Sequence, residues 1–236
     1  MNQGFKNRIA LVTGASRGIG RAAALALAKA GAHVVAVART SGALEELDDV
    51  IQKAGGAATL VPLDLKDGEG IDRMGAALFE RWGRLDALLG NAGVLGQVTP
   101  LAHLEPKVWD ELLAVNVTAN YRLIRSLDPL LRQSDAGRAL FISSDVARTH
   151  MPFFGGYSMS KAALESIVLT YAAECKDTRV KVNLFNPGPT RTGMRAQAFP
   201  GEDPAILPPP DAHVPTILEL LSPSCARHGE LISAKR

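Results

Sequence analysis

The chain has 236 residues, of which 47% are hydrophobic and 21% charged, and its formal net charge is +2. This composition fits a globular protein with a substantial core, and the near balance of charge argues against a nucleic-acid-binding protein. No run of about 18 apolar residues is present, so we expect no membrane-spanning helix. Without a signal-peptide pattern, and with two distant cysteines and no zinc-ligand cluster, we expect a cytoplasmic protein with free thiols and no metal site.

Short apolar runs alternate with helical patterns along the chain. We expect strands at residues 9–12, 33–37, 57–63, 85–89, 139–142, 180–185 and 229–233. We expect helices at residues 21–30, 44–53, 70–82, 106–131, 157–175 and 212–221. This alternation predicts an α/β fold with a doubly wound, Rossmann-like parallel sheet of about seven strands and helices on both faces. We expect one domain over residues 1–236, with the strand-poor, proline-rich stretch at about 188–212 as a surface excursion.

A glycine-rich turn follows the first expected strand and opens the first expected helix. It reads Thr13-Gly14-Ala15-Ser16-Arg17-Gly18-Ile19-Gly20. Glycine permits a tight turn and a close backbone approach, and the helix N-terminus offers free N–H groups to a phosphate. We therefore expect a dinucleotide site, whereas an ordinary turn is the alternative interpretation of three glycines. The expected contacts are Gly14, Ser16, Arg17, Gly18, Ile19 and Gly20.

The end of the second expected strand predicts which dinucleotide is preferred. An acidic residue there would bind the ribose 2′-hydroxyl, whereas an arginine would hold a 2′-phosphate. The chain has Arg39 at this point, and the nearest acids, Glu45 and Glu46, fall inside the next helix. Because Arg39 and Arg17 are suited to binding phosphate, we predict a preference for NADP(H), with NAD(H) also possible. The alternative is that both arginines are ordinary solvated charges.

Two further strand ends carry candidate cofactor contacts, because ligands of open α/β sheets bind beyond the carboxyl ends of the strands. The third expected strand ends in Asp64-Leu65 and the fourth in Asn91-Ala92-Gly93. Asp64 is expected either to accept a bond from the adenine amino group or to cap the next helix. The Asn91 amide can hold neighbouring strand ends, and Gly93 leaves room for the cofactor.

Tyr157 and Lys161 lie four residues apart at the start of a long expected helix. Residues at this spacing share one helix face. A lysine ammonium there would lower the pKa of the phenol, so that it exchanges a proton nearer neutral pH. Such a group beside a dinucleotide predicts hydride transfer to or from a carbonyl. The structural alternative is a half-buried aromatic residue followed by a surface lysine.

These motifs, in this order, resemble those of the short-chain dehydrogenase/reductase family from Arg8 to about Ser233. Further matches are Asn116 within Val-Asn-Val, the pair Ser143-Ser144, and Asn186-Pro187-Gly188-Pro189-Thr190-Arg191-Thr192. The resemblance implies an enzyme that interconverts a carbonyl and a secondary alcohol, with Asn116, Ser144, Tyr157 and Lys161 as its catalytic residues. It implies that Tyr157 is the acid/base, Lys161 binds the nicotinamide ribose, Ser144 bonds the substrate oxygen, and Asn116 anchors a water.

The resemblance also implies roles for the segment after the sixth expected strand. Pro187 and Gly188 would approach the nicotinamide, and Thr190 or Thr192 would bond its carboxamide or the phosphates. The following run to Pro204 resembles a bacterial branch of the family with unassigned substrates, distantly similar to 3-oxoacyl-[acyl-carrier-protein] reductases. Five apolar residues are expected either to line a substrate pocket or to pack at the bases of the loops: Met151, Phe153, Phe154, Met194 and Phe199.

The sequence leaves alternatives for the role of three arginines and for catalytic activity, and the family resemblance bears on the oligomeric state. Arg148, Arg191 and Arg195 would bind an anionic substrate or serve as surface charges. Members of the family are usually homodimers or homotetramers built through the helices that carry Asn116 and Tyr157, so we expect the same here. A dinucleotide-binding regulatory protein with little turnover is the second functional interpretation, and the intact set of catalytic residues argues against it.

Overall fold

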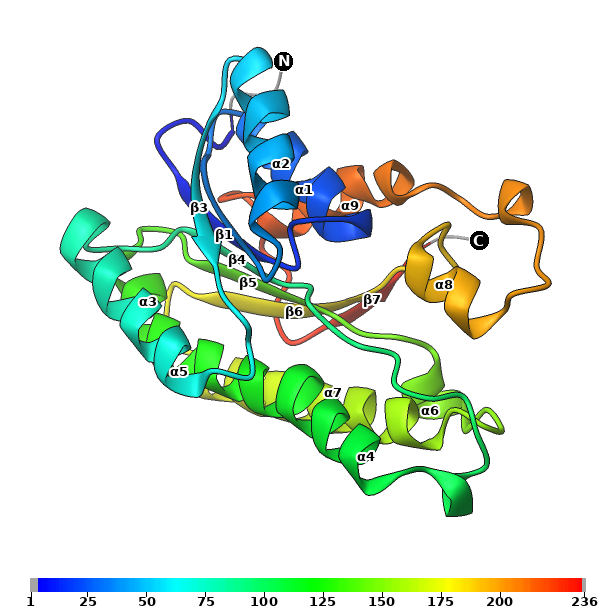
Figure 1. The fold of residues 1–236 in the computed structure, drawn as a ribbon. Helices are drawn as coiled ribbons and strands as arrows, with labels where there is room; N and C mark the ends of the chain where they lie inside the picture. Colours follow the sequence, from blue (N-terminus) through cyan, green and yellow to red (C-terminus); the bar gives the residue numbers. More distant parts are fainter. Residues whose placement is uncertain (1–3, 235–236) are drawn as a thin grey trace.

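Residues 4–234, which the computed structural model describes, form one parallel sheet of seven strands in the order β3-β2-β1-β4-β5-β6-β7 (Figure 1). The strands are β1 Ile9–Thr13, β2 His33–Ala38, β3 Ala57–Pro62, β4 Ala87–Gly90, β5 Arg138–Ile142, β6 Lys181–Asn186 and β7 Leu231–Ser233. The order reverses between β1 and β4, so a ligand-binding crevice is expected beyond these two strands. The predicted doubly wound sheet is confirmed.

Helices cover both faces of the sheet. They are α1 Gly18–Lys29, α2 Ser41–Lys53, α3 Gly68–Trp82, α4 Pro106–Leu112, α5 Ala119–Gln133, α6 Val146–Thr149, α7 Gly155–Glu174, α8 Gly193–Ala198 and α9 Val214–Leu221. Short 3₁₀ turns lie at Leu101–His103, Pro204–Ile206 and Pro210–His213. Figure 1 shows α1, α2 and α9 on one face and α3, α5 and α7 on the other. Among the described helices, none combines the length and apolarity needed to cross a membrane.

The strands separate two hydrophobic cores because successive side chains point to opposite faces. Leu11 of β1 packs into the core beneath α3, α5 and α7, whereas Ala10 and Val12 pack into the core beneath α1, α2 and α9. All five residues of β1 are buried. This burial on both faces explains why the sequence shows continuous apolar runs rather than alternation.

The long helix predicted at residues 106–131 is interrupted by a π-helical turn at Leu113–Thr118, between α4 and α5. Asn116 lies within this turn, and Asn120 Nδ2 donates to its backbone oxygen at 2.9 Å. A side-chain amide therefore satisfies a carbonyl at the point where the regular helical bonding changes. Turns of this kind are frequent at functional sites. The helix prediction is correct in position but wrong in expecting a regular helix throughout.

Candidate active site

The glycine-rich turn joins β1 to α1 in a conformation that its glycines permit. Gly14 and Gly18 have φ values of +66° and +57°. A Cβ atom at Gly20 would lie 2.3 Å from the Gly14 oxygen and 2.4 Å from Asn91 Nδ2, so only glycine fits there. Arg17 is the N-cap of α1, and no side chain in the described part of the chain caps this end. The first N–H groups of α1 are thus available to an anion, aided by the helix dipole.

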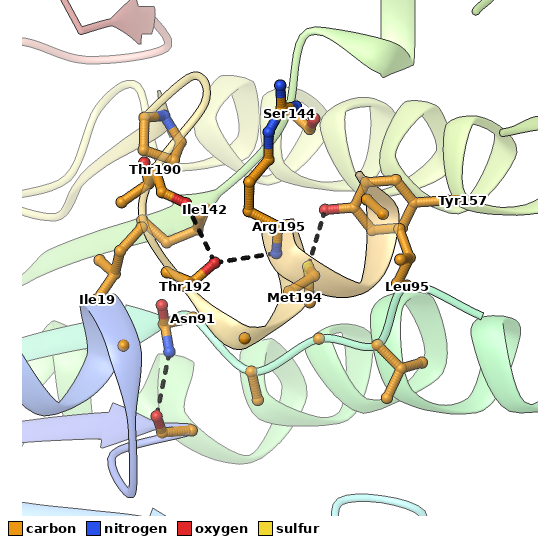
Figure 2. A pocket seen from close by; sticks show the side chains of 18 of the residues that line it. Ile19, Asn91, Leu95, Ile142, Ser144, Tyr157, Thr190, Thr192, Met194 and Arg195 are labelled. Carbon is orange, nitrogen blue, oxygen red and sulfur yellow. Dashed lines mark hydrogen bonds between the residues drawn. The ribbon is translucent and has the colours of Figure 1, made fainter. Parts of the chain in front are cut away.

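The carboxyl ends of β1 and β4 are joined through Thr13 and Asn91. The Thr13 hydroxyl accepts from the Asn91 and Ala92 N–H groups at 3.0 Å each. The Asn91 amide donates to the Thr13 oxygen at 2.9 Å and to the Gly14 oxygen at 3.3 Å, and Figure 2 draws one of these two bonds. As expected, Asn91 holds neighbouring strand ends together, and it does so at the point where the strand order reverses.

A cavity of about 720 Å³ lies beyond these strand ends. Its lining brings together most of the residues that the sequence singles out: Gly14, Ser16, Arg17, Gly18, Ile19, Arg39, Asp64, Leu65, Asn91, Ala92, Gly93, Ser144, Tyr157, Lys161, Pro187, Gly188, Thr190 and Thr192. Gly20 and Asn116 are buried and do not line the cavity. The strand order sets Arg39, after β2, on one side of the switch point and Ser144, after β5, on the other.

The side of the cavity near β2 carries two exposed arginines, Arg17 and Arg39. Neither guanidinium forms an ion pair or a hydrogen bond within residues 4–234. Asp64 also lines the cavity, where it accepts from the Lys66 N–H at 3.0 Å. The N-cap of α3 is instead Asp67, which accepts from the Gly70 N–H at 2.8 Å. The alternative interpretation of Asp64 as a helix cap is therefore wrong.

Tyr157 and Lys161 both project into the cavity from the first turns of α7. Lys161 is buried, and its ammonium donates to the Ile142 carbonyl at 2.8 Å. It lies 5.8 Å from the centroid of the Tyr157 ring. The Tyr157 hydroxyl lies 3.8 Å from the sulfur of Met194, as Figure 2 shows. The reactive oxygen is thus enclosed by the segment that follows β6.

The protonation of this pair differs from the sequence expectation. Burial raises the pKa of the Tyr157 phenol to about 12, which the Ser144 side chain offsets only in part. Burial also lowers the pKa of Lys161 to about 8, against the opposing effect of the Glu165 carboxylate. The prediction that Lys161 lowers the pKa of Tyr157 is wrong for this structure, because burial dominates and the ammonium is bonded to the end of β5.

The two consecutive serines after β5 have different environments. The Ser143 hydroxyl is buried and donates to Glu165, which also binds Arg148. Ser144 is less buried and lies on the cavity beside Tyr157. This supports Ser144 as the serine available to a ligand. Glu165, one helical turn after Lys161, was not predicted, although its i,i+4 spacing places it beside the lysine.

Asn116 acts from outside the cavity lining. Its side-chain oxygen accepts from the Val94 N–H at 2.9 Å, and its amide donates to the Val94 oxygen and the Ser160 hydroxyl, each at 2.9 Å. Asn116 therefore fastens the loop after β4 to α7. Its predicted role in anchoring a water stays a prediction.

Thr190 and Thr192 shape the segment after β6. The buried Thr190 hydroxyl donates to the Gly188 oxygen at 3.1 Å and bonds His213 Nε2 at 2.8 Å. Thr192 caps α8 by accepting from the Arg195 N–H at 3.2 Å, a bond drawn in Figure 2. Both threonine hydroxyls thus form hydrogen bonds within the protein. His213 was not predicted, because it is distant from the other site residues in the sequence.

The apolar candidates divide between the cavity and the surface. Met151, Phe154, Met194 and Phe199 line the cavity, whereas Phe153 is 56% exposed and has a positive φ of +72°. The placement of Phe153 in the pocket is therefore wrong. Asp145 accepts from the Asn186 amide and so links the loop after β5 to the end of β6.

A doubly wound sheet with a glycine turn and a Tyr-x-x-x-Lys helix at one cavity is the architecture of an oxidoreductase. Residues 8–203 match the family model described as short chain dehydrogenase. The chain is 40% identical over 226 residues to the Uncharacterized oxidoreductase YciK of Escherichia coli K12, covering 94% of this chain and 89% of that protein. The chain therefore belongs to the short-chain dehydrogenase family, and a regulatory protein without turnover is not favoured.

Solved structures give the same result over the whole fold. A short chain dehydrogenase from Shigella flexneri 2a, complexed with NADP, is 38% identical with a TM-score of 0.95 over 99% of each chain. Another from Escherichia coli CFT073, complexed with NADPH, is 38% identical with a TM-score of 0.94 over 100% of each chain. The sheet and the covering helices of this chain are thus those of its relatives.

Proposed function

We propose that the protein uses NADP(H) to interconvert a carbonyl and a secondary alcohol, with Tyr157 as the acid/base. The observation that carries the proposal is the convergence of Ser144, Tyr157 and Lys161 on the cavity that also holds the uncapped end of α1. A proton donor, an oxygen-binding hydroxyl and a phosphate-binding helix end are the groups that this reaction requires.

The cavity fits a nicotinamide dinucleotide in both shape and charge. The turn at Gly14, Gly18 and Ile19 would hold the pyrophosphate on the N–H groups of α1. Arg17 and Arg39 would hold a ribose 2′-phosphate, which favours NADP(H) over NAD(H). The two relatives solved with NADP and NADPH support this preference. At Gly188, no other heavy atom of the described chain lies within 4 Å of a Cβ position, which leaves room for a ligand.

The residues of this chain then divide the chemistry of carbonyl reduction. The dinucleotide supplies the hydride when bound. Ser144 donates a hydrogen bond to the carbonyl oxygen and stabilises the negative charge that develops on it. Tyr157 gives its proton to the same oxygen, and because its pKa is about 12 the phenol is protonated at neutral pH and can act as the acid. Lys161, whose ammonium is held by the Ile142 carbonyl, would bond the nicotinamide ribose.

A direct experiment measures NADPH consumption by the purified protein against a panel of ketones, aldehydes and thioesters, with NADH as the parallel cofactor. The proposal expects turnover of at least one carbonyl class, faster with NADPH than with NADH. If NADPH binds but no carbonyl of the panel is reduced, the proposal fails and a regulatory role is supported.

We further infer that residues 1–236 act as one domain and that the protein assembles as a homodimer or homotetramer. Exposed large side chains on the two helices expected at the interface support the assembly, because Tyr121 of α5 is 50% exposed and Leu169 of α7 is 40% exposed. Light scattering on the wild type and on Tyr121→Glu tests it: the wild type is expected to be oligomeric and the variant smaller. A monomeric wild type would contradict the inference. The cytoplasmic location stays a prediction.

A further inference from the structure

The segment from Thr190 to Pro204, whose sequence resembles a branch with unassigned substrates, folds against the cavity. It begins after β6 and forms α8 beyond the ends of β6 and β7 (Figure 1). Met194 meets the Tyr157 hydroxyl, and Arg195 lies next to it on the same helix (Figure 2). The segment therefore supplies part of the wall that a substrate of Tyr157 would contact.

Phe199 is the aromatic residue of this segment that lines the cavity, and its ring packs between Arg195 and Phe154. The Phe199 ring lies 3.8 Å beneath the Arg195 guanidinium carbon and stacks on Phe154, with 5.6 Å between ring centroids. The Arg195 guanidinium also donates to both carboxylate oxygens of Glu202, at 2.6 and 2.7 Å. This is a bidentate charged pair, the geometry for which a guanidinium is best suited. Arg195 thus has fixed partners on its edge and on one face.

The Arg195–Glu202 pair sets the charge that Arg195 brings to the cavity wall. The lining that includes Arg195 also contains the apolar side chains of Leu95, Met151, Met194 and the two phenylalanines, and the polar side chains of Ser144, Asp145 and Lys161. Hydrogen bonding to Arg195 lowers the pKa of Glu202, so the pair is ionised on both sides at neutral pH and carries no net charge. Both side chains are about four-fifths buried, at 23% and 21% exposure. An incoming carboxylate would therefore meet an arginine that is already neutralised.

The other two arginines near the segment are expected to bind an anionic substrate more weakly than an unpaired Arg195 would. Arg148 is paired with Glu165, outside the cavity lining. Arg191 lines the cavity, but its side chain is exposed, so water and salt screen its charge.

We propose that Glu202 is a specificity-determining residue: by neutralising Arg195 it makes the enzyme select uncharged, apolar carbonyl compounds and reject those that carry a carboxylate. This inference rests on the proposed function of the same site. The loss of the Glu202 charge would release a guanidinium at the wall, where a charge-assisted hydrogen bond to a substrate carboxylate corresponds to roughly tenfold or more in affinity.

The test compares two ketones of nearly equal shape, 4-acetylbenzamide and 4-acetylbenzoate, which differ in charge. With NADPH, the wild type is expected to reduce the neutral amide with at least tenfold higher kcat/KM. Glu202→Gln is expected to move this ratio toward the carboxylate by roughly tenfold or more. The double variant Arg195→Gln/Glu202→Gln should restore the wild-type preference, because it breaks the pair without leaving a charge. Were the shift caused by a loosened segment, the double variant would keep it.

Two controls separate this charge effect from general effects. Glu69→Gln breaks an exposed pair with Arg73 on α3 and should change neither the activity nor the ratio. Arg191→Gln in the Glu202→Gln background should leave the shifted ratio in place. If the shift requires Arg191, or if the wild type already prefers the carboxylate, the inference is overturned.

A binding measurement makes the outcome independent of turnover. Calorimetric titration of the two ketones into NADPH-loaded Tyr157→Phe protein, with and without Glu202→Gln, should show the same change in preference. Binding preference without any ketone reduction by the wild type would refute the proposed function and leave this inference standing. Equal binding of both ketones, or binding of neither, would overturn the inference.

Discussion

Replacing Lys161 with Met is expected to stabilise the protein without a bound dinucleotide while removing a catalytic group. The lysine is buried at 4% exposure, and burial lowers its pKa from 10.5 to about 8. At about pH 7 this shift corresponds to about 3 kcal/mol lost from the free energy of unfolding, since the folded state holds a charge away from water. Met removes the charge but leaves the Ile142 carbonyl without its donor, which costs about 1–2 kcal/mol.

The net expectation is a gain of about 1–2 kcal/mol for Lys161→Met at about pH 7. Between the folded pKa of about 8 and the unfolded value of 10.5, the folded wild type has lost a proton that the unfolded chain keeps. Wild-type stability therefore rises with pH in this window, and the advantage of the Met variant shrinks.

Urea unfolding at about pH 7 and about pH 10 measures both quantities in the protein without dinucleotide. Lys176→Met is the matched control, because this lysine is exposed just after α7 and its replacement should change stability by less than about 0.5 kcal/mol at either pH. A Lys161→Met variant that is less stable than wild type, or whose advantage is the same at both pH values, would refute the reasoning.

Three further predictions concern the cofactor and the proton. Arg39→Asp should raise the Kd for NADPH roughly tenfold or more and leave that for NADH nearly unchanged, as measured by fluorescence titration; an unchanged preference would mean that Arg39 is only a surface charge. Gly20→Ala should destabilise the protein by about 1–3 kcal/mol in urea unfolding, because the new methyl group would meet the Gly14 oxygen; wild-type stability would contradict the tight turn. The rate of alcohol oxidation should increase as pH rises toward the Tyr157 pKa of about 12, whereas the rate of ketone reduction should not. Initial rates measured in both directions test this, and the same dependence on pH in both directions would mean that Tyr157 is not the acid/base.

The sequence predicts the sheet because its five central strands are buried, and so read as apolar runs, and because the helices between the strands have clear ends. Gly31, for example, has a φ of +99° just after α1, where a glycine is expected to end a helix. The short helices α6 and α8 were not predicted, because a helix of one turn depends on its tertiary contacts more than on its own sequence. The π turn around Asn116, whose carbonyl accepts from the Asn120 side chain, changes the helical bonding in a way that the spacing of apolar residues does not reveal.

The candidate site could be predicted in its members but not in its electrostatics. The motif order predicts that Gly14, Ser144 and Tyr157 meet at one edge of the sheet, because parallel strands end at the same edge, and in the structure all three line one cavity. The pKa of Tyr157 was predicted in the wrong direction, since its burial comes partly from Met194, a residue distant in the sequence. The contact of Arg195 with Glu202 likewise depends on how the chain folds back after α8.

The most direct test of the central claim is single-turnover reduction of a ketone by NADPH-loaded wild type and Tyr157→Phe. We expect the variant to bind NADPH as tightly as the wild type but to transfer hydride about 10²–10⁴-fold more slowly, because the proton donor is gone. Hydride transfer by Tyr157→Phe within a few-fold of the wild-type rate would contradict this claim.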